Sequence, residues 1–149
     1  MYELYKIESE QDASEWLELA KLAKIARPER FIHLIKIKNP TIDDGFAFAL
    51  KKKDSPDILA TAFLKRTLYD QNHSISLFAI ATKPDLKGMG IGRILLEKIE
   101  TIIKQHKATE IRLFTTTAYG FYEKCGYKKY GELTSETGIP RYYQYKTIE

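Results

Sequence analysis

The segment Gly88–Gly92 has the composition of a turn that binds an anion through its backbone. It holds three glycines, follows the apolar segment 75–81 and precedes a strongly amphipathic segment. Glycine adopts positive φ angles and lets a ligand approach the main chain closely. The first N–H groups of a helix have no internal partner, and the helix dipole adds partial positive charge there. Because Lys87 and Arg93 add full charges on either side, the segment predicts a site for phosphate or pyrophosphate.

The spacing of these glycines excludes two common nucleotide-binding motifs. A P-loop requires Gly-x-x-x-x-Gly-Lys-Ser/Thr, and no Lys-Ser or Lys-Thr pair follows the glycines here. A dinucleotide-binding fingerprint requires Gly-x-Gly-x-x-Gly, and its third glycine would fall on Arg93. The alternative that needs no ligand is a tight strand-to-helix turn, which also favours glycine.

Two segments of the chain resemble motifs of the GNAT N-acetyltransferase superfamily. Lys87–Gly92 is similar to its acyl-CoA-binding motif, Gln/Arg-x-x-Gly-x-Gly/Ala, with Lys87 in the first place. Ala118–Tyr127 is similar to the family's Ala-x-x-x-Tyr-x-x-x-Gly-Phe segment. The two segments occur in the expected order, and the order of predicted elements agrees along nearly the whole chain.

The resemblance implies that acetyl-CoA is the acyl donor and that the main chain makes most of its contacts. The end of the central strand would pair with the pantetheine arm, and the amides of the loop would hold the pyrophosphate. Thr115 stands where the family often has Asn and still offers a hydroxyl. The expected cofactor-binding residues are Ile80, Ala81, Thr82, Lys87, Gly88, Met89, Gly90, Ile91, Gly92, Arg93 and Thr115. Because Lys87 departs from the family's Gln/Arg, we expect an altered phosphate contact without loss of binding.

The resemblance also implies that Tyr122 is the catalytic residue, beside the CoA sulfur as general acid. A phenol pKa of about 10 and a thiol pKa of about 8.5 make full proton transfer uphill by roughly 2 kcal/mol. We therefore expect a hydrogen bond to the developing thiolate to matter more than full transfer. A backbone N–H near the end of the central strand would meet the oxyanion. Tyr119, three residues earlier, is the competing candidate for the acid.

No general base and no metal site can be assigned. Segment 74–81 contains no Asp or Glu, and His73 at its start is more typical of a loop histidine. Ser76 could help to hold a relay water. The single cysteine, Cys125, follows Lys124 at the end of a short predicted helix, where the dipole disfavours a thiolate. We therefore expect Cys125 to be buried and inert.

Hydrophobic periodicity predicts the elements that carry these residues. A helix should begin near Ser9 and end before Pro28, and a second should run from Glu29 to about Ile37. The other expected helices are 91–103 and 118–124, and the expected strands are 2–7, 46–51, 58–66, 75–81, 111–114, 127–130 and 141–145. The apolar strand 75–81 should be covered on both faces. This order predicts a mixed sheet, and the resemblance specifies the fold class: α/β, with a mostly antiparallel central sheet flanked by helices.

Composition limits the class of protein. A chain of 149 residues, 44% hydrophobic and with one Cys, fits a single domain over residues 1–149 in a reducing compartment. No apolar run approaches the ~20 residues of a membrane helix, so we expect a cytoplasmic protein without membrane contact. The net charge is +4, and Lys51–Lys53 is typical of a solvated turn, so no nucleic-acid partner is expected.

The sequence therefore predicts an acetyl-CoA-dependent N-acetyltransferase in which the amine attacks directly in a ternary complex. The acceptor would be a small-molecule amine or a peptide or protein amine, and segment 27–45 should wall its site. The Tyr-rich C-terminal strands would line that site or form a homodimer interface. Two alternatives remain: a CoA-binding sensor without catalysis, and an enzyme that binds another phosphate ligand in the loop.

Overall fold

The computed structural model describes residues 1–25, 27–32, 41–67 and 73–148. Its strands form one sheet in the order β1-β2-β3-β4-β5-β7-β6. The strands are β1 (Tyr2–Lys6), β2 (Phe46–Lys52), β3 (Ala60–Lys65), β4 (Ser74–Thr82), β5 (Glu110–Thr115), β6 (Lys128–Thr134) and β7 (Pro140–Thr147). The helices are α1 (Glu10–Leu22), α2 (Glu29–Ile32), α3 (Ile91–Gln105) and α4 (Tyr119–Lys124), with a 3₁₀ helix, η2 (Pro84–Leu86). Only β4 and β5 pair in parallel among these strands, so the predicted mixed, mostly antiparallel α/β fold is confirmed.

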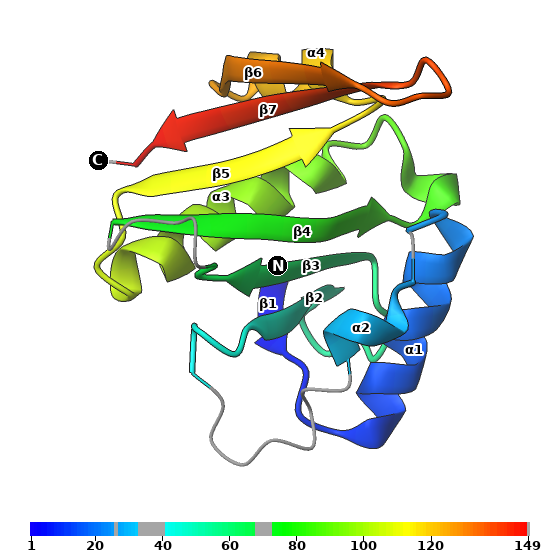
Figure 1. Ribbon diagram of the computed structural model, residues 1–149. Coiled ribbons are helices and arrows are strands. Elements are labelled where there is room, and N and C mark those ends of the chain that lie inside the picture. Colours follow the sequence, from blue (N-terminus) through cyan, green and yellow to red (C-terminus); the bar gives the residue numbers. More distant parts are fainter. Residues whose placement is uncertain (26, 33–40, 68–72, 149) are drawn as a thin grey trace.

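The central pair, β4 and β5, separates along its length. Its register runs from Ser74 opposite Glu110 to Ser76 opposite Arg112. Beyond these positions the two strands diverge, and Figure 1 shows the gap widening toward the carboxyl ends of both strands. One edge of β4 therefore has no partner among the described strands over its second half, which leaves main-chain groups at the centre of the sheet without ladder hydrogen bonds on that side.

A β-bulge interrupts β4 next to this gap. Phe78 pairs with Phe63 and Ala81 pairs with Thr61, so two residues of β4 stand opposite one residue of β3. Ala79 has φ +54°, and the fully buried Thr61 donates its hydroxyl to the Ala79 carbonyl oxygen at 2.9 Å. The positive φ of a non-glycine residue destabilises the fold by about 1–3 kcal/mol and persists only where the surrounding structure holds the residue. The Thr61 hydrogen bond and the pairing on both sides of Ala79 hold the bulge in place.

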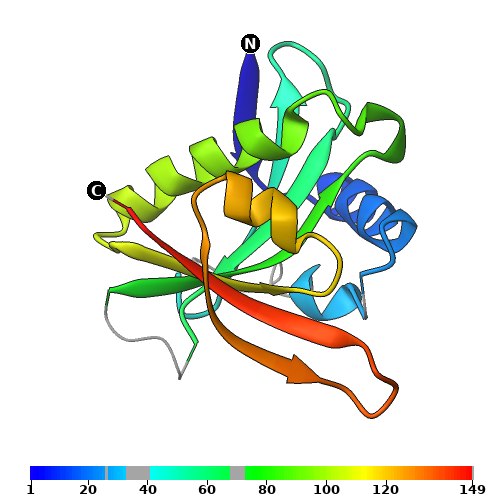
Figure 2. The same ribbon diagram turned by 90° about the horizontal axis from the view of Figure 1, so that it is seen from above.

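Helices cover the two faces of the sheet unequally (Figures 1 and 2). On one face α3 buries Leu95, Ile99 and Ile103 against the sheet. On the other face α1 and α2 bury Trp16 and Phe31, and the Trp16 indole N–H donates to the Phe48 carbonyl at 3.0 Å. Helices α1 and α2 lie over the β2–β4 side, so no helix of the described chain covers this face of β5, β7 and β6.

Most predicted elements are present, with differences at their ends. The Ser9 hydroxyl accepts from the Asp12 N–H at 3.1 Å, so it caps α1 as the sequence predicts. The helix predicted from Glu29 is described to Ile32, and its remainder lies outside the described residues. The prediction that strand β4 is covered on both faces is wrong in part. Ile75 and Leu77 are buried, whereas Ser76 is only half-buried because its face carries no helix there.

Candidate functional site

A cavity of about 750 Å³ lies where β4, η2 and the first turns of α3 and α4 meet the end of α1. The sequence predicts twelve site residues, and nine of them line this cavity: Ile80, Ala81, Thr82, Lys87, Gly88, Gly90, Ile91, Gly92 and Tyr122. The fold thus brings the end of the central strand, the glycine loop and the tyrosine to one space. It does so although they are separated in sequence by some forty residues.

The backbone conformation of the loop requires glycine at two of its three glycine positions. Gly88 has φ +83° and Gly90, the N-cap of α3, has φ +78°. A Cβ added at either position would meet no protein atom within 4 Å. Crowding therefore does not require glycine here; the left-handed backbone does.

The third glycine, Gly92, has a different role. A Cβ on Gly92 would lie 2.9 Å from the ring of Phe121, so this glycine lets α4 pack against the first turn of α3. Phe121 also lines the cavity.

The main-chain N–H groups of the loop are mostly unused. Met89 donates to the Leu86 carbonyl at 3.3 Å, and the first helical bond runs from Ile94 to the Gly90 carbonyl at 3.1 Å. Within the described chain, five N–H groups have no acceptor: those of Gly88, Gly90, Ile91, Gly92 and Arg93. Helix α3 has fifteen residues, and its dipole favours negative charge at this end. Together these donors form a cradle suited to an anion.

Three predicted residues do not line the cavity. Met89 is 64% exposed and its amide is engaged within the loop. Arg93 is exposed on the first turn of α3, where its charge adds to the local positive potential. The Thr115 hydroxyl accepts from the Ala118 N–H at 2.9 Å, so it shapes the turn that leads into α4.

Tyr122 is the one titratable group in the cavity wall that is buried. Its ring packs edge-on against Phe121 and Tyr127, with centroid distances of 5.1 and 5.7 Å. Burial raises the pKa of the Tyr122 phenol well above its ordinary value, so the group stays protonated and can donate. The competing Tyr119 lies outside the wall. It donates to the Glu123 carboxylate at 3.3 Å and packs on Tyr142.

Two other candidates do not belong to this cavity. Cys125 is buried behind α4, and burial raises the pKa of its thiol, which opposes a nucleophilic role. His73 is exposed just before β4, and it lines neither this cavity nor the one described next. Among the described residues, no group of three or more His, Cys, Asp or Glu could hold a metal ion. No helix in the described ranges is long and apolar enough to cross a membrane.

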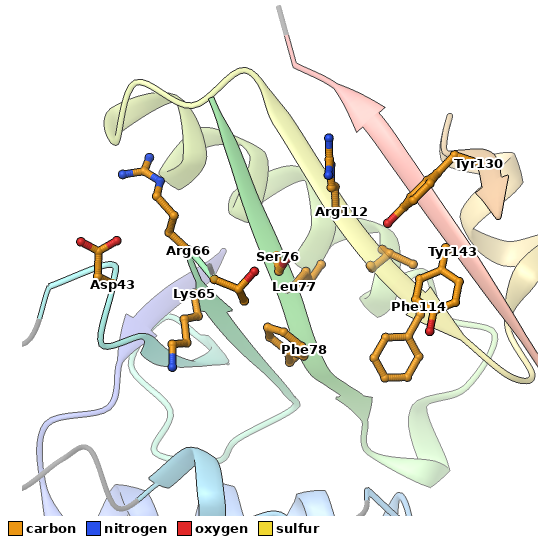
Figure 3. Close-up of a pocket in the computed structure, with 12 residues that line it drawn as sticks. Asp43, Lys65, Arg66, Ser76, Leu77, Phe78, Arg112, Phe114, Tyr130 and Tyr143 are labelled. Atoms are coloured by element: carbon orange, nitrogen blue, oxygen red, sulfur yellow. The ribbon is translucent and has the colours of Figure 1, made fainter. Parts of the chain in front are cut away.

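A second cavity, of about 950 Å³, opens on the face of the sheet that none of the described helices covers (Figure 3). Sequence reasoning placed the acceptor wall in segment 27–45, and from that segment only Asp43 lines the cavity within the described chain. The other walls come from five strands or their ends, and include Lys65, Ser76, Phe78, Arg112, Phe114, Tyr130 and Tyr143. The sequence offered the Tyr-rich C-terminal strands as one possible lining of the acceptor site, and Tyr130 and Tyr143 of these strands do line this cavity. Ser76 was considered only for a relay water. The sequence analysis missed Lys65, Phe78, Arg112 and Phe114, because they come together only through the strand order.

The two cavities are lined by neighbouring parts of β4. Phe78 lines the larger cavity and Ile80 lines the smaller one, so the bulge at Ala79 lies between these two lining residues. The bulge therefore separates the part of β4 that faces one cavity from the part that faces the other.

Comparison with known proteins identifies the family. The model of the acetyltransferase (GNAT) domain matches residues 46–129. YyaT, an uncharacterized protein of Bacillus subtilis, is 32% identical over 77 residues, which are 51% of this chain and 52% of that protein. The uncharacterized N-acetyltransferase ycf52 of Pyropia yezoensis is 24% identical over 127 residues, 85% of this chain and 65% of that protein. The chain thus matches about half to two thirds of the length of these relatives.

Solved structures share the fold over nearly the whole chain. An aminoglycoside 6′-N-acetyltransferase in complex with coenzyme A superposes with a TM-score of 0.76 at 17% identity, covering 100% of this chain and 97% of its own. The ribosomal-protein-S18-alanine N-acetyltransferase of Escherichia coli gives a TM-score of 0.73 at 17% identity, covering 100% and 95%. At 17% sequence identity, these two comparisons show that the fold is shared and nothing more. Together with the family match over more than half of the sequence, it shows that the chain belongs to the GNAT acetyltransferase family.

Proposed function

We propose that this protein transfers the acetyl group of acetyl-CoA to a primary amine by direct attack in a ternary complex. The observation that carries the proposal is that four residues with unused loop N–H groups, Gly88, Gly90, Ile91 and Gly92, line one cavity with the buried Tyr122, at the divergence of β4 and β5. Membership in an acetyltransferase family supports acyl transfer from CoA.

The cofactor would bind mainly to the backbone. The pyrophosphate would accept hydrogen bonds from the cradle of the glycine loop, with the exposed Lys87 adding a screened charge. The pantetheine arm would lie along Ile80–Thr82, where the edge of β4 has no strand partner. An extended ligand can add to such an edge through main-chain hydrogen bonds. Both contacts would point the thioester toward the bulge.

The chemical step would use groups at the bulge and on α4. The neutral amine forms the C–N bond as the C–S bond breaks, the amine loses a proton to water, and CoA leaves as the thiolate. The bulge takes main-chain groups of Ala79 and Ile80 out of regular pairing, and an N–H there could meet the oxyanion. Tyr122 would stabilise the thiolate by a hydrogen bond. Since burial raises the phenol pKa, full proton transfer is less favourable than reference values indicate.

Calorimetric titration and a turnover assay test this function. CoA and acetyl-CoA should bind competitively, whereas ATP and NAD should not compete. Release of free thiol from acetyl-CoA should require an amine from a panel of α-amino peptides, lysine, polyamines and aminoglycosides. Absence of heat with CoA would contradict the binding site. Binding without turnover on any amine would instead support a CoA sensor.

The pH dependence of transfer is a second test. The rate should rise with pH as the acceptor amine loses its proton, and should not fall again below about pH 10. No fall is expected because burial keeps Tyr122 protonated above the ordinary phenol pKa of about 10. The measurement is kcat/KM between pH 6 and 10 with one acceptor. A fall between pH 7 and 9 would contradict Tyr122 as the donor.

A further inference from the structure

The larger cavity is organised in rows across the sheet. Lys65 stands opposite Ser76, and Ser76 stands opposite Arg112, so these three residues form a polar row. Phe78 and Phe114 lie two residues further along β4 and β5, on the same face as the polar row because side chains alternate. The bulge at Ala79 comes next along β4. The cavity is thus polar at one end and aromatic in its middle, and the bulge beyond the aromatic residues leads along β4 toward the proposed thioester site.

The middle of the cavity is suited to a flat apolar group. Figure 3 shows Phe78 and Phe114 on either side of the space that opens between β4 and β5. Phe114 is 39% exposed, and its ring packs against Tyr143 at a centroid distance of 5.9 Å. The Phe78 ring packs against the ring of Phe31 at a centroid distance of 6.0 Å. A ligand ring between these side chains would gain both apolar burial and aromatic contact.

The charges in the cavity favour an anion. Among the described residues, four charged ones line it: Lys65, Arg66, Arg112 and Asp43. Arg112 forms an ion pair with Glu110, and Figure 3 shows Arg66 directed away from the aromatic side chains. Lys65 and Arg66 are half-buried, and neither forms an ion pair with a carboxylate of the described chain. Two unpaired cations beside one acid favour an anionic ligand and disfavour a polycation.

The distance along β4 between the polar row and the bulge sets the length of the ligand. Ala79 is three residue steps beyond Ser76 along β4, which is about 10 Å at 3.3 Å per residue. Figure 3 shows the Lys65 side chain extending in the direction in which β4 runs, on the side of Phe78 that is away from Phe114. A ligand with its acid on Lys65 and its amine at the bulge therefore needs a spacer about as long as a ring.

We propose that the acceptor is an aromatic primary amine that carries a carboxylate, bound with the carboxylate on Lys65 and the ring between Phe78 and Phe114. This inference rests on the proposed acetyl transfer, since it assigns the second substrate of that reaction. It separates this protein from its aminoglycoside-acetylating structural neighbours, because within the described residues its cavity offers one carboxylate, Asp43, to a polycationic acceptor.

A matched pair of acceptors tests the proposal. In 4-(aminomethyl)benzoate and 4-(aminomethyl)benzamide the amine is far from the group that differs, so its basicity is nearly the same. The benzoate should have the higher kcat/KM by about tenfold, the value of one hydrogen bond to a charged group. Spermidine and kanamycin should be poorer than both. Equal use of the two aromatic amines, or better use of a polycation, would overturn the inference.

Variants of Lys65 test whether this side chain binds the carboxylate, and a variant of Lys128 is the control. Lys65→Gln should lower kcat/KM for the benzoate by about tenfold and leave the benzamide nearly unchanged, and Lys65→Arg should restore most of the difference. Lys128→Gln, which changes an exposed lysine on β6 outside the cavity, should alter neither. An equal loss on both acceptors in Lys65→Gln would show a structural role and contradict the proposal.

A binding measurement separates this inference from the proposed function. The benzoate should bind the complex of protein and CoA in calorimetry, and more tightly than the benzamide. If the benzoate binds but no amine is acetylated, acetyl transfer is wrong and the ligand assignment stands. If amines are acetylated without preference for the carboxylate, acetyl transfer stands and the assignment is wrong.

Discussion

Tyr122→Phe should lower kcat for acetyl transfer by about 10²–10⁴-fold, the usual contribution of a positioned proton donor. The change removes one hydroxyl from the cavity wall and keeps the ring that packs between Phe121 and Tyr127. The affinity for CoA should stay nearly the same, because the cradle amides lie on another element. Rates come from thiol release at saturating amine, and the dissociation constant comes from calorimetry.

Two other tyrosines provide matched controls. Tyr127 is 2% exposed against 6% for Tyr122, and burial raises the pKa of both phenols, but Tyr127 does not line the cavity. Its buried hydroxyl has no hydrogen-bond partner among the described residues, so Tyr127→Phe should keep the rate and not lower stability. Tyr119→Phe should also keep the rate. An unchanged rate in Tyr122→Phe, or a loss confined to Tyr119→Phe, would remove Tyr122 as the donor.

Gly90→Ala should weaken CoA binding by about tenfold and lower the free energy of unfolding by roughly 1 kcal/mol. An added methyl meets no protein atom, so the strain comes from a φ of +78°. Relaxing that strain rotates the peptide that follows and turns the cradle N–H groups away from the phosphate. Calorimetry with CoA and denaturant unfolding measure the two effects.

Gly138 supplies the control for this change. It lies in the turn between β6 and β7 with φ +84°, and an added Cβ there also meets nothing within 4 Å. Gly138→Ala should therefore cost about the same stability and leave CoA binding unchanged. Equal losses of CoA affinity in both variants would mean that the effect is general destabilisation. No loss in Gly90→Ala would mean that the loop does not bind the cofactor.

The cofactor side of the site could be predicted because it is local in sequence. Residues 87–93 form one turn and the start of one helix, and both the glycine spacing and the apolar helix face are visible in the chain. The positive φ of Gly88 and Gly90 follows from residue type. The position of Tyr122 beside this turn depended on the family resemblance, since composition alone makes any one of ten tyrosines a packing residue.

The rest of the site could not be predicted because it depends on long-range pairing. The bulge at Ala79 has no glycine to mark it, and it is held by a hydroxyl eighteen residues earlier, on Thr61. Strand β7 lies between β5 and β6, against the order of the chain, and this brings Tyr143 beside Phe114. The end of β6 was predicted too early, because its residues are mostly exposed and show no alternation.

A crystal structure with acetyl-CoA bound tests the central claim most directly. The account predicts pyrophosphate oxygens about 3 Å from the unused amides between Gly88 and Arg93, and the thioester sulfur within hydrogen-bonding reach of the Tyr122 hydroxyl. A cofactor bound elsewhere, or a loop whose amides turn away from the phosphates, would contradict it.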